Sequence, residues 1–254
     1  MSAPSGPTLA AVILTYNEEE HVADCIASVQ WADRIVVFDS FSQDRTVEIA
    51  RAAGADVLQH AFENYAGQRN AALAAVEADW ILFVDADERS SPAQAGEVRT
   101  MIASGAHNGY WIPRHNYIFG KLTRHTGWYP DYQMRLLRRG QARYDPERQV
   151  HELVLLEGEP GYLETPLIHY NYRDLAQFRA KQGRYVQYDA RILQAQGIQP
   201  KPHKFLTQPL RQFVWRYITL QGYRDGLHGL QLSLLMAWYE LQKYRHLRRL
   251  TRTG

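Results

Sequence analysis

The stretch 81-ILFVDADE-88 places three carboxylates directly after four apolar residues. A short apolar run of this kind predicts a buried strand. In an extended chain, residues i and i+2 point the same way and lie roughly 6–7 Å apart, so Asp85 and Asp87 can face one ligand. We expect a cation to balance these two neighbouring charges.

Apolar runs recur along the first ninety residues at roughly regular spacing, with helical patterns between them. The runs that predict strands are Leu9–Leu14, Arg34–Phe38, Ala55–Leu58 and Trp80–Val84. The intervening helical patterns are Glu18–Gln30, Asp44–Ala53 and Tyr65–Val76. Strands that alternate with helices predict an α/β fold, in which a mainly parallel sheet of right-handed βαβ units is flanked by helices.

Beyond Glu88 the pattern becomes more mixed. Ser91, Pro92 and Gln94 predict a capped helix start, and this helix should run to about Ala103. Further strands are predicted at Tyr110–Arg114, Gln133–Arg138 and Gln149–Leu156, and a further helix at Arg173–Gln196.

The last part of the chain has a different character. Prolines 200, 202 and 209 mark a boundary, so we predict one domain over residues 1–197 and a helical extension over residues 198–254. Apolar residues at helical spacing make this extension amphipathic, which fits either packing on the domain or lying on a membrane surface. The arginines that close the chain favour anionic lipid; they are Arg245, Arg248, Arg249 and Arg252.

Charge is unevenly distributed along the 254 residues. Residues 1–100 carry 6 Lys and Arg against 16 Asp and Glu, whereas residues 201–254 carry 10 against 2. The acidic half argues against nucleic-acid binding. The single cysteine, Cys25, and the absence of a signal-like segment or a membrane-spanning run favour a cytoplasmic protein that is peripheral at the inner face of the membrane.

Polar residues follow the predicted strands, where ligands bind in open α/β sheets. They include Thr15-Tyr16-Asn17-Glu18, Asp39-Ser40 and Asp85-Ala86-Asp87. Mg²⁺ or Mn²⁺ suits one or two carboxylates together with phosphate oxygens. Because the sequence has neither a P-loop nor a GxGxxG fingerprint, a metal and side chains such as Arg69 would have to neutralise a diphosphate.

Four motifs in series carry a family resemblance. VILTYNEE, VVFDSFSQDRT, AGQRNAAL and WILFVDADE together resemble the family-2 inverting glycosyltransferases of the GT-A fold, over most of residues 8–90. The later stretches GWYPDYQMRLLRR, QVHE, IHYNY and GYRDGLHGL are similar to the bacterial lipopolysaccharide inner-core β-1,4-glucosyltransferases.

This resemblance implies a set of site residues. A nucleotide-sugar donor would be held around its base and ribose by Thr15, Asn17, Glu18 and Asp39. Asp85 would face the ribose and the metal, Asp87 would ligate the metal, and Arg69 would lie near the nucleotide.

Two acids compete for the role of catalytic base. Asp131 lies beside aromatic residues that could stack on a sugar, and it is preferred to Glu152. His151 could complete the metal shell, whereas His169, between Ile168 and Tyr170, fits a core histidine and is left out. Either acid could instead be a structural partner of Arg135, Arg138 or Arg148.

The sequence therefore predicts a metal-dependent inverting glycosyltransferase. It would move a hexose, with glucose preferred, from a UDP-sugar to a lipid-linked glycan acceptor of the lipopolysaccharide core. Two alternatives stay open, a nucleotidyltransferase and a non-catalytic module that binds nucleotide sugar or lipid. The run Tyr16 to Glu20 weighs against the first, because its carboxylates would repel a triphosphate.

Overall fold

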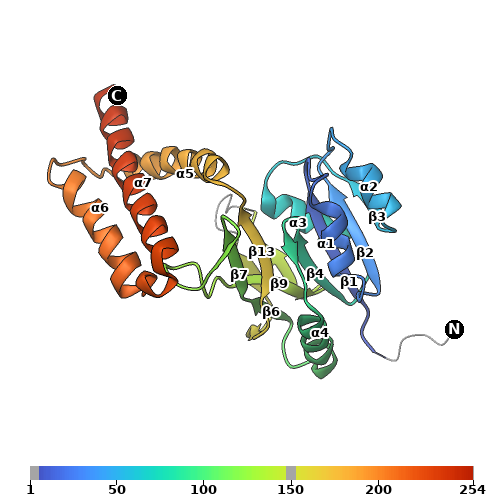
Figure 1. Cartoon of the computed structure of the whole chain (residues 1–254). Helices are drawn as coiled ribbons and strands as arrows, with labels where there is room; N and C mark the ends of the chain where they lie inside the picture. The colour runs from blue at the N-terminus through green and yellow to red at the C-terminus, as the bar shows by residue number, and fades with distance from the viewer. Residues whose placement is uncertain (1–5, 147–152, 254) are drawn as a thin grey trace. The chain divides into compact units, whose positions relative to one another are not determined.

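The computed structural model describes residues 6–146 and 153–253, which fold as two compact units (Figure 1). The N-terminal unit comprises Met1–Arg114 and Tyr132–His169, and the C-terminal unit comprises His115–Asp131 and Tyr170–Gly254. This division differs from the predicted boundary between residues 197 and 198. The chain enters the C-terminal unit twice, so a boundary drawn at one point along the sequence does not separate the units.

A seven-stranded sheet forms the centre of the N-terminal unit, in the order β12-β6-β9-β4-β1-β2-β3. Strands β1, β2, β3 and β4 pair in parallel, whereas β9 runs antiparallel to both of its neighbours. The strands are β1 (Leu9–Thr15), β2 (Arg34–Asp39), β3 (Asp56–Gln59), β4 (Trp80–Asp85), β6 (Gly109–Ile112), β9 (Gln133–Arg138) and β12 (Gly161–Tyr162). The predicted mainly parallel α/β sheet is confirmed.

Helices pack on both faces of this sheet, and the side chains of alternate β1 residues point to opposite faces. Leu9, Ala11 and Ile13 pack in one apolar cluster with α1, α2 and α4. Ala10 and Val12 pack in the other, with α3. The helices are α1 (Val22–Ser28), α2 (Thr46–Ala52), α3 (Tyr65–Ala75) and α4 (Pro92–Ser104). Because the central strands are buried on both faces, their sequences are continuously apolar rather than alternating.

The start of α4 follows the predicted signal in part. Ser91 is the N-cap, and its side chain accepts a hydrogen bond from the backbone N–H of Gln94, while Pro92 occupies the first turn. The side chain of Gln94 does not return to the cap; its Nε2 donates to the carbonyl oxygen of Thr165, 3.2 Å away. The Ser91 half of the predicted capping box is therefore present. The other half, a hydrogen bond from the Gln94 side chain back to Ser91, is replaced by the contact with Thr165.

Shorter strands complete the N-terminal unit. β10 (Ala142–Tyr144) and β11 (Val154–Leu156) form an antiparallel pair, and β5 (Glu88–Arg89) pairs with the first part of β13 (Leu167–Tyr172). Of the strand predicted at Gln149–Leu156, only the end is seen as β11, since residues 147–152 lie outside the described part of the chain.

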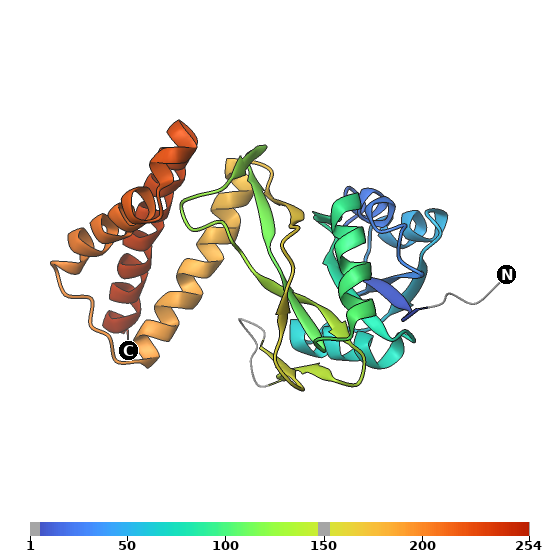
Figure 2. The same cartoon turned by 90° about the horizontal axis from the view of Figure 1, so that it is seen from below.

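The C-terminal unit is mainly helical. Ile118, Tyr172, Phe178 and Leu232 form its central apolar cluster. Helices α6 and α7 lie side by side (Figures 1 and 2). The elements are β7 (Arg114–Ile118), β8 (Lys121–Thr123), α5 (Leu175–Ala195), α6 (Lys204–Val214), a π-helical turn (Trp215–Thr219), a 3-10 turn (Gly222–Asp225) and α7 (Gly226–Thr253).

The predicted boundary at prolines 200, 202 and 209 ends before its third proline. Pro209 lies inside α6, although proline removes a hydrogen-bond donor and normally ends or kinks a helix. Helix α6 packs along α7, and this packing outweighs the local preference. No helix within residues 6–146 and 153–253 is long and apolar enough to cross a bilayer.

Candidate active site

The ends of three neighbouring parallel strands bring predicted site residues to one edge of the sheet. Thr15 at the end of β1 is in register with Asp39 at the end of β2. Leu14 of β1 is in register with Asp85 at the end of β4. The structure therefore gathers Thr15, Asp39 and Asp85, which lie far apart in the sequence, at the carboxyl edge where such sheets bind ligands.

The carboxylate of Asp39 is fully buried and saturated with donors. Thr15 Oγ1 donates to Oδ1 at 3.0 Å, and the Ser42 backbone N–H and Gln59 Nε2 donate to Oδ2 at 2.9 and 3.0 Å. The Ser42 hydroxyl is a fourth donor. Asp39 thus holds the ends of three strands together. Its predicted contact with a nucleotide stays a prediction.

Asn17 and Glu18 lie in the loop after β1, which is hydrogen-bonded to the segment after β2. Asn17 has a left-handed backbone, with φ 57°, a conformation that asparagine tolerates better than most residues. Its Oδ1 accepts from the Gln43 backbone N–H at 2.8 Å, and its own N–H donates to Ser42 Oγ at 2.9 Å. The N–H of Glu18 donates to Thr46 Oγ1 at 2.8 Å. The loops after β1 and β2 therefore form one braced surface.

The side chain of Glu18 has an unusual electrostatic setting. Burial, and then the negative charges of Asp87, Asp44 and Asp85, raise the pKa of Glu18 from 4.5 to about 7. The carboxyl is therefore substantially protonated at neutral pH, and it can donate a hydrogen bond where an ordinary glutamate could not.

Asp85 is held by two buried arginines. Arg69 Nη2 and Arg135 Nη1 each lie 3.1 Å from Oδ1, and the second terminal nitrogen of Arg135 contacts Oδ2. Burial acts to raise the pKa of Asp85, but Arg135, Arg69 and Arg114 outweigh it, so this pKa lies well below its usual range. Arginines therefore balance the charge of Asp85 in this structure, and its predicted contact with a metal stays a prediction.

Glu88 faces inward and extends the same charge cluster. Its side chain is fully buried, and its Oε1 lies 3.1 Å from Arg114 Nη1 and 3.5 Å from Arg135 Nη2. Its Oε2 accepts from the Asp85 backbone N–H at 2.9 Å. Two carboxylates thus meet three arginines, and the cluster carries a net positive charge.

Sequence reasoning missed the role of two of these arginines. Arg114 was not considered, and Arg135 was considered only as a partner of Asp131 or Glu152. One signal was present in β9, where Arg135 lies among the apolar residues of QMRLLR. An arginine in a buried strand needs a carboxylate partner. Which carboxylate it meets depends on the pairing of β9 with β4.

Asp87 lies next to a histidine that we had left out of the metal site. His169 Nε2 is 3.4 Å from Asp87 Oδ2, and the two side chains are 7% and 29% exposed. The contact arises because β13 pairs antiparallel with β5, so that His169 lies opposite Glu88. The flanking residues of His169 gave no indication of this neighbour, which is set by strand pairing alone.

The donor set at Asp87 fits a divalent cation only with help from a ligand. Over residues 6–146 and 153–253, no group of three or more His, Cys, Asp or Glu side chains converges as a metal cage would. Mg²⁺ and Mn²⁺ commonly take one or two protein ligands together with phosphate oxygens and water. The carboxylate of Asp87 and the imidazole of His169 suit such a shared site. His151, the third predicted ligand, and Glu152 lie outside the described residues.

Comparison with known proteins agrees with this geometry. The family model described as Glycosyl transferase family 2 matches residues 10–152, which is more than half of the chain. The chain belongs to glycosyltransferase family 2. It is thus an enzyme that transfers sugars, and the predicted family is confirmed.

Individual relatives extend the similarity beyond the family match. The chain is 29% identical over 243 residues to the lipopolysaccharide core biosynthesis glycosyltransferase LpsC of Rhizobium meliloti (strain 1021), covering 91% of this chain and 88% of LpsC. It is 27% identical to a glycosyltransferase of Rickettsia bellii (strain RML369-C), covering 96% and 87% of the two chains.

Among solved structures, the mannosyltransferase PcManGT of Pyrobaculum calidifontis has a TM-score of 0.57 at 12% identity, covering 95% of this chain and 87% of that one. This likeness shows the fold. The predicted GT-A architecture with C-terminal helices is confirmed.

The predicted base of this glycosyltransferase, Asp131, is the last residue of a segment of the C-terminal unit. The buried amide of Asn116 donates to Asp131 Oδ2 at 3.1 Å and to the carbonyl oxygen of Trp128 at 2.8 Å. Asn171 donates in turn to Asn116 Oδ1 at 3.2 Å. Paired amides therefore fix the orientation of the Asp131 carboxylate.

The tail motif GYRDGLHGL of the glycosyltransferase fastens this same segment. Asp225 accepts from the backbone N–H of His125 at 2.9 Å and lies 2.8 Å from its Nδ1. His228 Nε2 lies 3.0 Å from the hydroxyl of Thr123. Thr123 and His125 are thus held by the 3-10 turn and the start of α7, which explains why their segment belongs to the C-terminal unit.

Proposed function

We propose that this enzyme is a metal-dependent, inverting glycosyltransferase that moves a hexose from a UDP-sugar to a lipid-linked glycan acceptor. The observation that carries the proposal is the placement of Asp85 and Asp87 beyond β4. Asp85 is fastened by Arg69 and Arg135, and Asp87 is left beside His169. Asp85 is paired with arginines, whereas the side chain of Asp87 is 29% exposed and lies 3.4 Å from a histidine, a residue type that also binds divalent metals.

Asp87 and His169 would hold Mg²⁺ or Mn²⁺ in this proposal. A bound cation would stabilise the negative charge that develops on the departing diphosphate. The mannosyltransferase PcManGT was solved with GDP-Man and Mn²⁺, which supports a divalent metal here. Asp85, predicted earlier as a second ligand, would act mainly by fixing Arg69 and Arg135 near the diphosphate, where a net positive cluster favours anions.

The nucleotide would lie along the braced loops after β1 and β2. Glu18, Asn17, Thr15 and Asp39 are proposed to contact the base and ribose, directly or by shaping the loop. Asp39 and Thr15 would orient each other, because Thr15 Oγ1 donates a hydrogen bond to the Asp39 carboxylate. The protonated fraction of Glu18 gives this surface a donor that a sugar hydroxyl or a base carbonyl could accept.

Inversion requires an acceptor hydroxyl to attack C1 from the side opposite the diphosphate, while a base takes its proton. Asp131 is the proposed base. Its carboxylate is oriented by Asn116, whose amide donates a hydrogen bond to Oδ2. Glu152 remains the rival for this role.

The acceptor class rests on the relative LpsC, which is named for lipopolysaccharide core biosynthesis. We therefore propose a core glycan carried on lipid as the acceptor and glucose as the preferred sugar. The enzyme would act as a peripheral protein at the inner, cytoplasmic face of the membrane.

The test is a panel of UDP-, GDP- and CMP-sugars, in which nucleotide release is measured with Mn²⁺ and with EDTA. Wild-type enzyme should release UDP from UDP-glucose only with metal. Asp87→Ala should reduce the rate by more than about a hundredfold, because the cation loses a direct ligand. Asp189→Ala, which removes an exposed carboxylate of α5, should leave the rate unchanged.

Two outcomes would overturn the proposal. Full activity of Asp87→Ala together with insensitivity to EDTA would remove the metal role. Release of pyrophosphate in place of UDP would indicate a nucleotidyltransferase. For the base, Asp131→Asn should bind UDP with wild-type affinity by calorimetry yet fail to transfer, and normal transfer by this variant would point to Glu152.

A further inference from the structure

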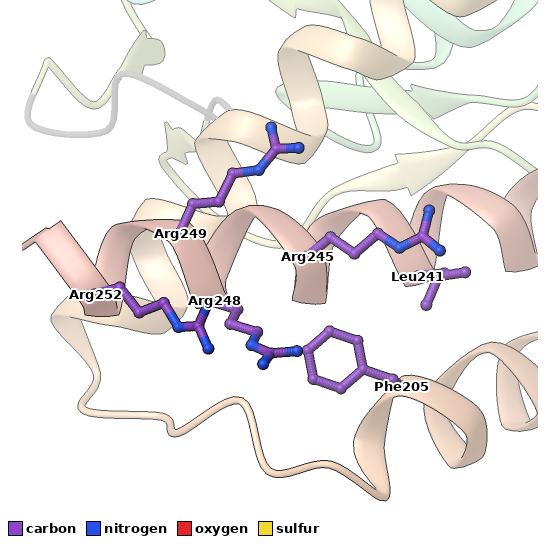
Figure 3. Close-up of a pocket in the computed structure, with 6 residues that line it drawn as sticks. All are labelled: Phe205, Leu241, Arg245, Arg248, Arg249 and Arg252. Carbon is purple, nitrogen blue, oxygen red and sulfur yellow. The ribbon is translucent and has the colours of Figure 1, made fainter.

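Four arginines line a cavity near the end of α7 (Figure 3). The cavity has a volume of about 630 Å³, and its lining consists of Phe205, Leu241, Arg245, Arg248, Arg249 and Arg252. Phe205 comes from α6, and the other five come from α7. The site is distinct from the carboxylates at the end of β4, and the proposed chemistry does not use it.

These α7 residues share one face of the helix. At 3.6 residues per turn, positions 241, 245, 248, 249 and 252 fall within an arc of roughly 100°. All four arginines are exposed, whereas Tyr244 and Leu247 between them are buried in the contact with α5 and α6. The four arginine side chains are therefore accessible to solvent.

Two of the arginines are positioned by aromatic rings. The Arg248 guanidinium carbon lies 5.8 Å from the centre of the Phe205 ring, and that of Arg245 lies 5.5 Å from the Trp238 ring. A cation held over a ring keeps its full charge and its N–H donors. Such stacking orients a guanidinium group without neutralising it.

Carboxylates are scarce around this cavity. The sequence of α6 contains no acid, that of α5 contains Asp189 alone, and that of α7 contains only Glu240, which lies 2.7 Å from Lys243. The helix dipole favours cations only within the last turn, and so accounts for Arg252 but not for Arg245 and Arg248. The positive charge concentrated here is complementary to an anion.

The same face of α7 becomes apolar toward its start. Leu227, Leu234 and Trp238 are 85%, 54% and 51% exposed, and helical spacing aligns them with Arg245 and Arg252. From Leu227 to Arg252 this strip is roughly 37 Å long at 1.5 Å per residue. A strip of this length, apolar at one end and cationic at the other, fits an extended surface better than a small ion.

We propose that this face of α7 binds an anionic lipid bilayer, with lipid phosphates in the arginine cavity and Leu227, Leu234 and Trp238 against the acyl boundary. Guanidinium groups recognise phosphate oxygens in bidentate fashion, and exposed leucine and tryptophan suit the membrane interface. The inference deepens the proposed function, since a lipid-linked acceptor requires the enzyme to reach a membrane surface.

Co-sedimentation of the full-length protein with vesicles tests this site. Vesicles of phosphatidylcholine with 30% phosphatidylglycerol should bind the wild-type protein, whereas pure phosphatidylcholine should not. Replacing Arg245, Arg248, Arg249 and Arg252 together by Gln should weaken binding by roughly six-hundredfold, given roughly fivefold per basic residue at such a surface. Trp238→Gln tests the apolar part separately and should also weaken binding.

A charge-matched control removes four exposed arginines elsewhere, namely Arg51, Arg143, Arg184 and Arg191, each changed to Gln. This control should bind vesicles as the wild type does. Equal losses of vesicle binding in the two quadruple variants would show that binding depends on net charge alone, and this would contradict a specific site on α7. Unchanged vesicle binding of the α7 variant would also overturn the proposal. Both variants should show wild-type circular dichroism.

Other anions define the remaining outcomes. If inorganic phosphate at 10 mM binds to the α7 arginines but vesicles do not bind to the protein, the cavity is a small-anion site and the lipid assignment is wrong. Tighter binding of a 20-nucleotide single-stranded RNA than of vesicles would likewise overturn it. UDP release measured without vesicles should be equal in wild type and the α7 variant, so failure of membrane binding is distinguishable from failure of the proposed transferase activity.

Discussion

At the scale of single residues, the three acids of the ILFVDADE stretch differ in their partners. Asp85 and Glu88 are bound by buried arginines, and Asp87 lies beside His169. Breaking a buried ion pair leaves an uncompensated charge, which is far more costly than losing an exposed pair. The arginines lower the pKa of Asp85 and therefore permit this acid to stay ionised at the edge of the sheet before any ligand binds.

Glu18 provides a pH-dependent prediction at this scale. The folded state holds its pKa at about 7 against 4.5 in an ordinary setting, so between these values the unfolded state releases the proton first. The contribution of Glu18 to stability is fully present below about pH 4.5 and is lost as pH rises through 7. Glu18→Gln should therefore raise the melting temperature at pH 8 but change it little at pH 4.5.

Thermal unfolding of both proteins between pH 4.5 and 8, in metal-free buffer, measures this difference. Glu63→Gln serves as the control, because Glu63 is an exposed acid outside the strand-end cluster. An equal gain from Glu18→Gln at pH 4.5 and pH 8 would show that burial of the charged carboxylate is not the cause.

At the scale of elements, a close approach of two glycines joins α7 to the turn before it. A Cβ built on Gly229 would lie 1.9 Å from the carbonyl oxygen of Gly222. The backbone of α7 can meet the 3-10 turn at this distance only because Gly229 has no side chain. The contact also positions Asp225 and His228, which hold residues 123–131.

Gly229→Ala should therefore destabilise the protein by about 1–3 kcal/mol, the usual range for forcing an extra methyl into packed structure. Differential scanning calorimetry should show a melting temperature lower by several degrees. Gly183→Ala, in α5 with open space around the built Cβ, is the matched control and should be neutral or slightly stabilising. Equal melting temperatures for the two variants would contradict the proposed close contact.

At the scale of the whole molecule, the two units are not consecutive along the chain. Residues 115–131 fold with the C-terminal helices, and Tyr132–His169 returns to the sheet. Ile118, Tyr172 and Phe178 pack against Leu232 of α7. The C-terminal helices are therefore part of the core that supports the predicted base, in addition to any role at a membrane.

Deletion of residues 205–254 should consequently do more than release the protein from vesicles. We expect the shortened chain to expose the Ile118 cluster, to bind the dye ANS and to lose sugar transfer, while UDP binding by the N-terminal unit persists in calorimetry. A chain that lacks only the last two residues is the control. A monomeric, fully active protein without residues 205–254 would refute this view of the C-terminal unit.

Local pattern in the sequence determined the elements and the family. The apolar runs predicted β1 to β4 within one or two residues, Ser91 predicted the start of α4, and the motif series predicted family 2 and the GT-A fold. These features depend on neighbouring residues, so a linear sequence contains them directly.

Tertiary structure alone decided the partners of the charged groups and the division into units. Arg135 meets Asp85 across 50 positions, His169 meets Asp87 through strand pairing, and Asp225 meets His125 across 100 positions. Charges act through space rather than along the chain, so their pairing is fixed only when strand order and register are fixed. The sequence therefore determined which chemistry is present, and the fold decided which acids are paired with arginine and which acid lies beside a histidine.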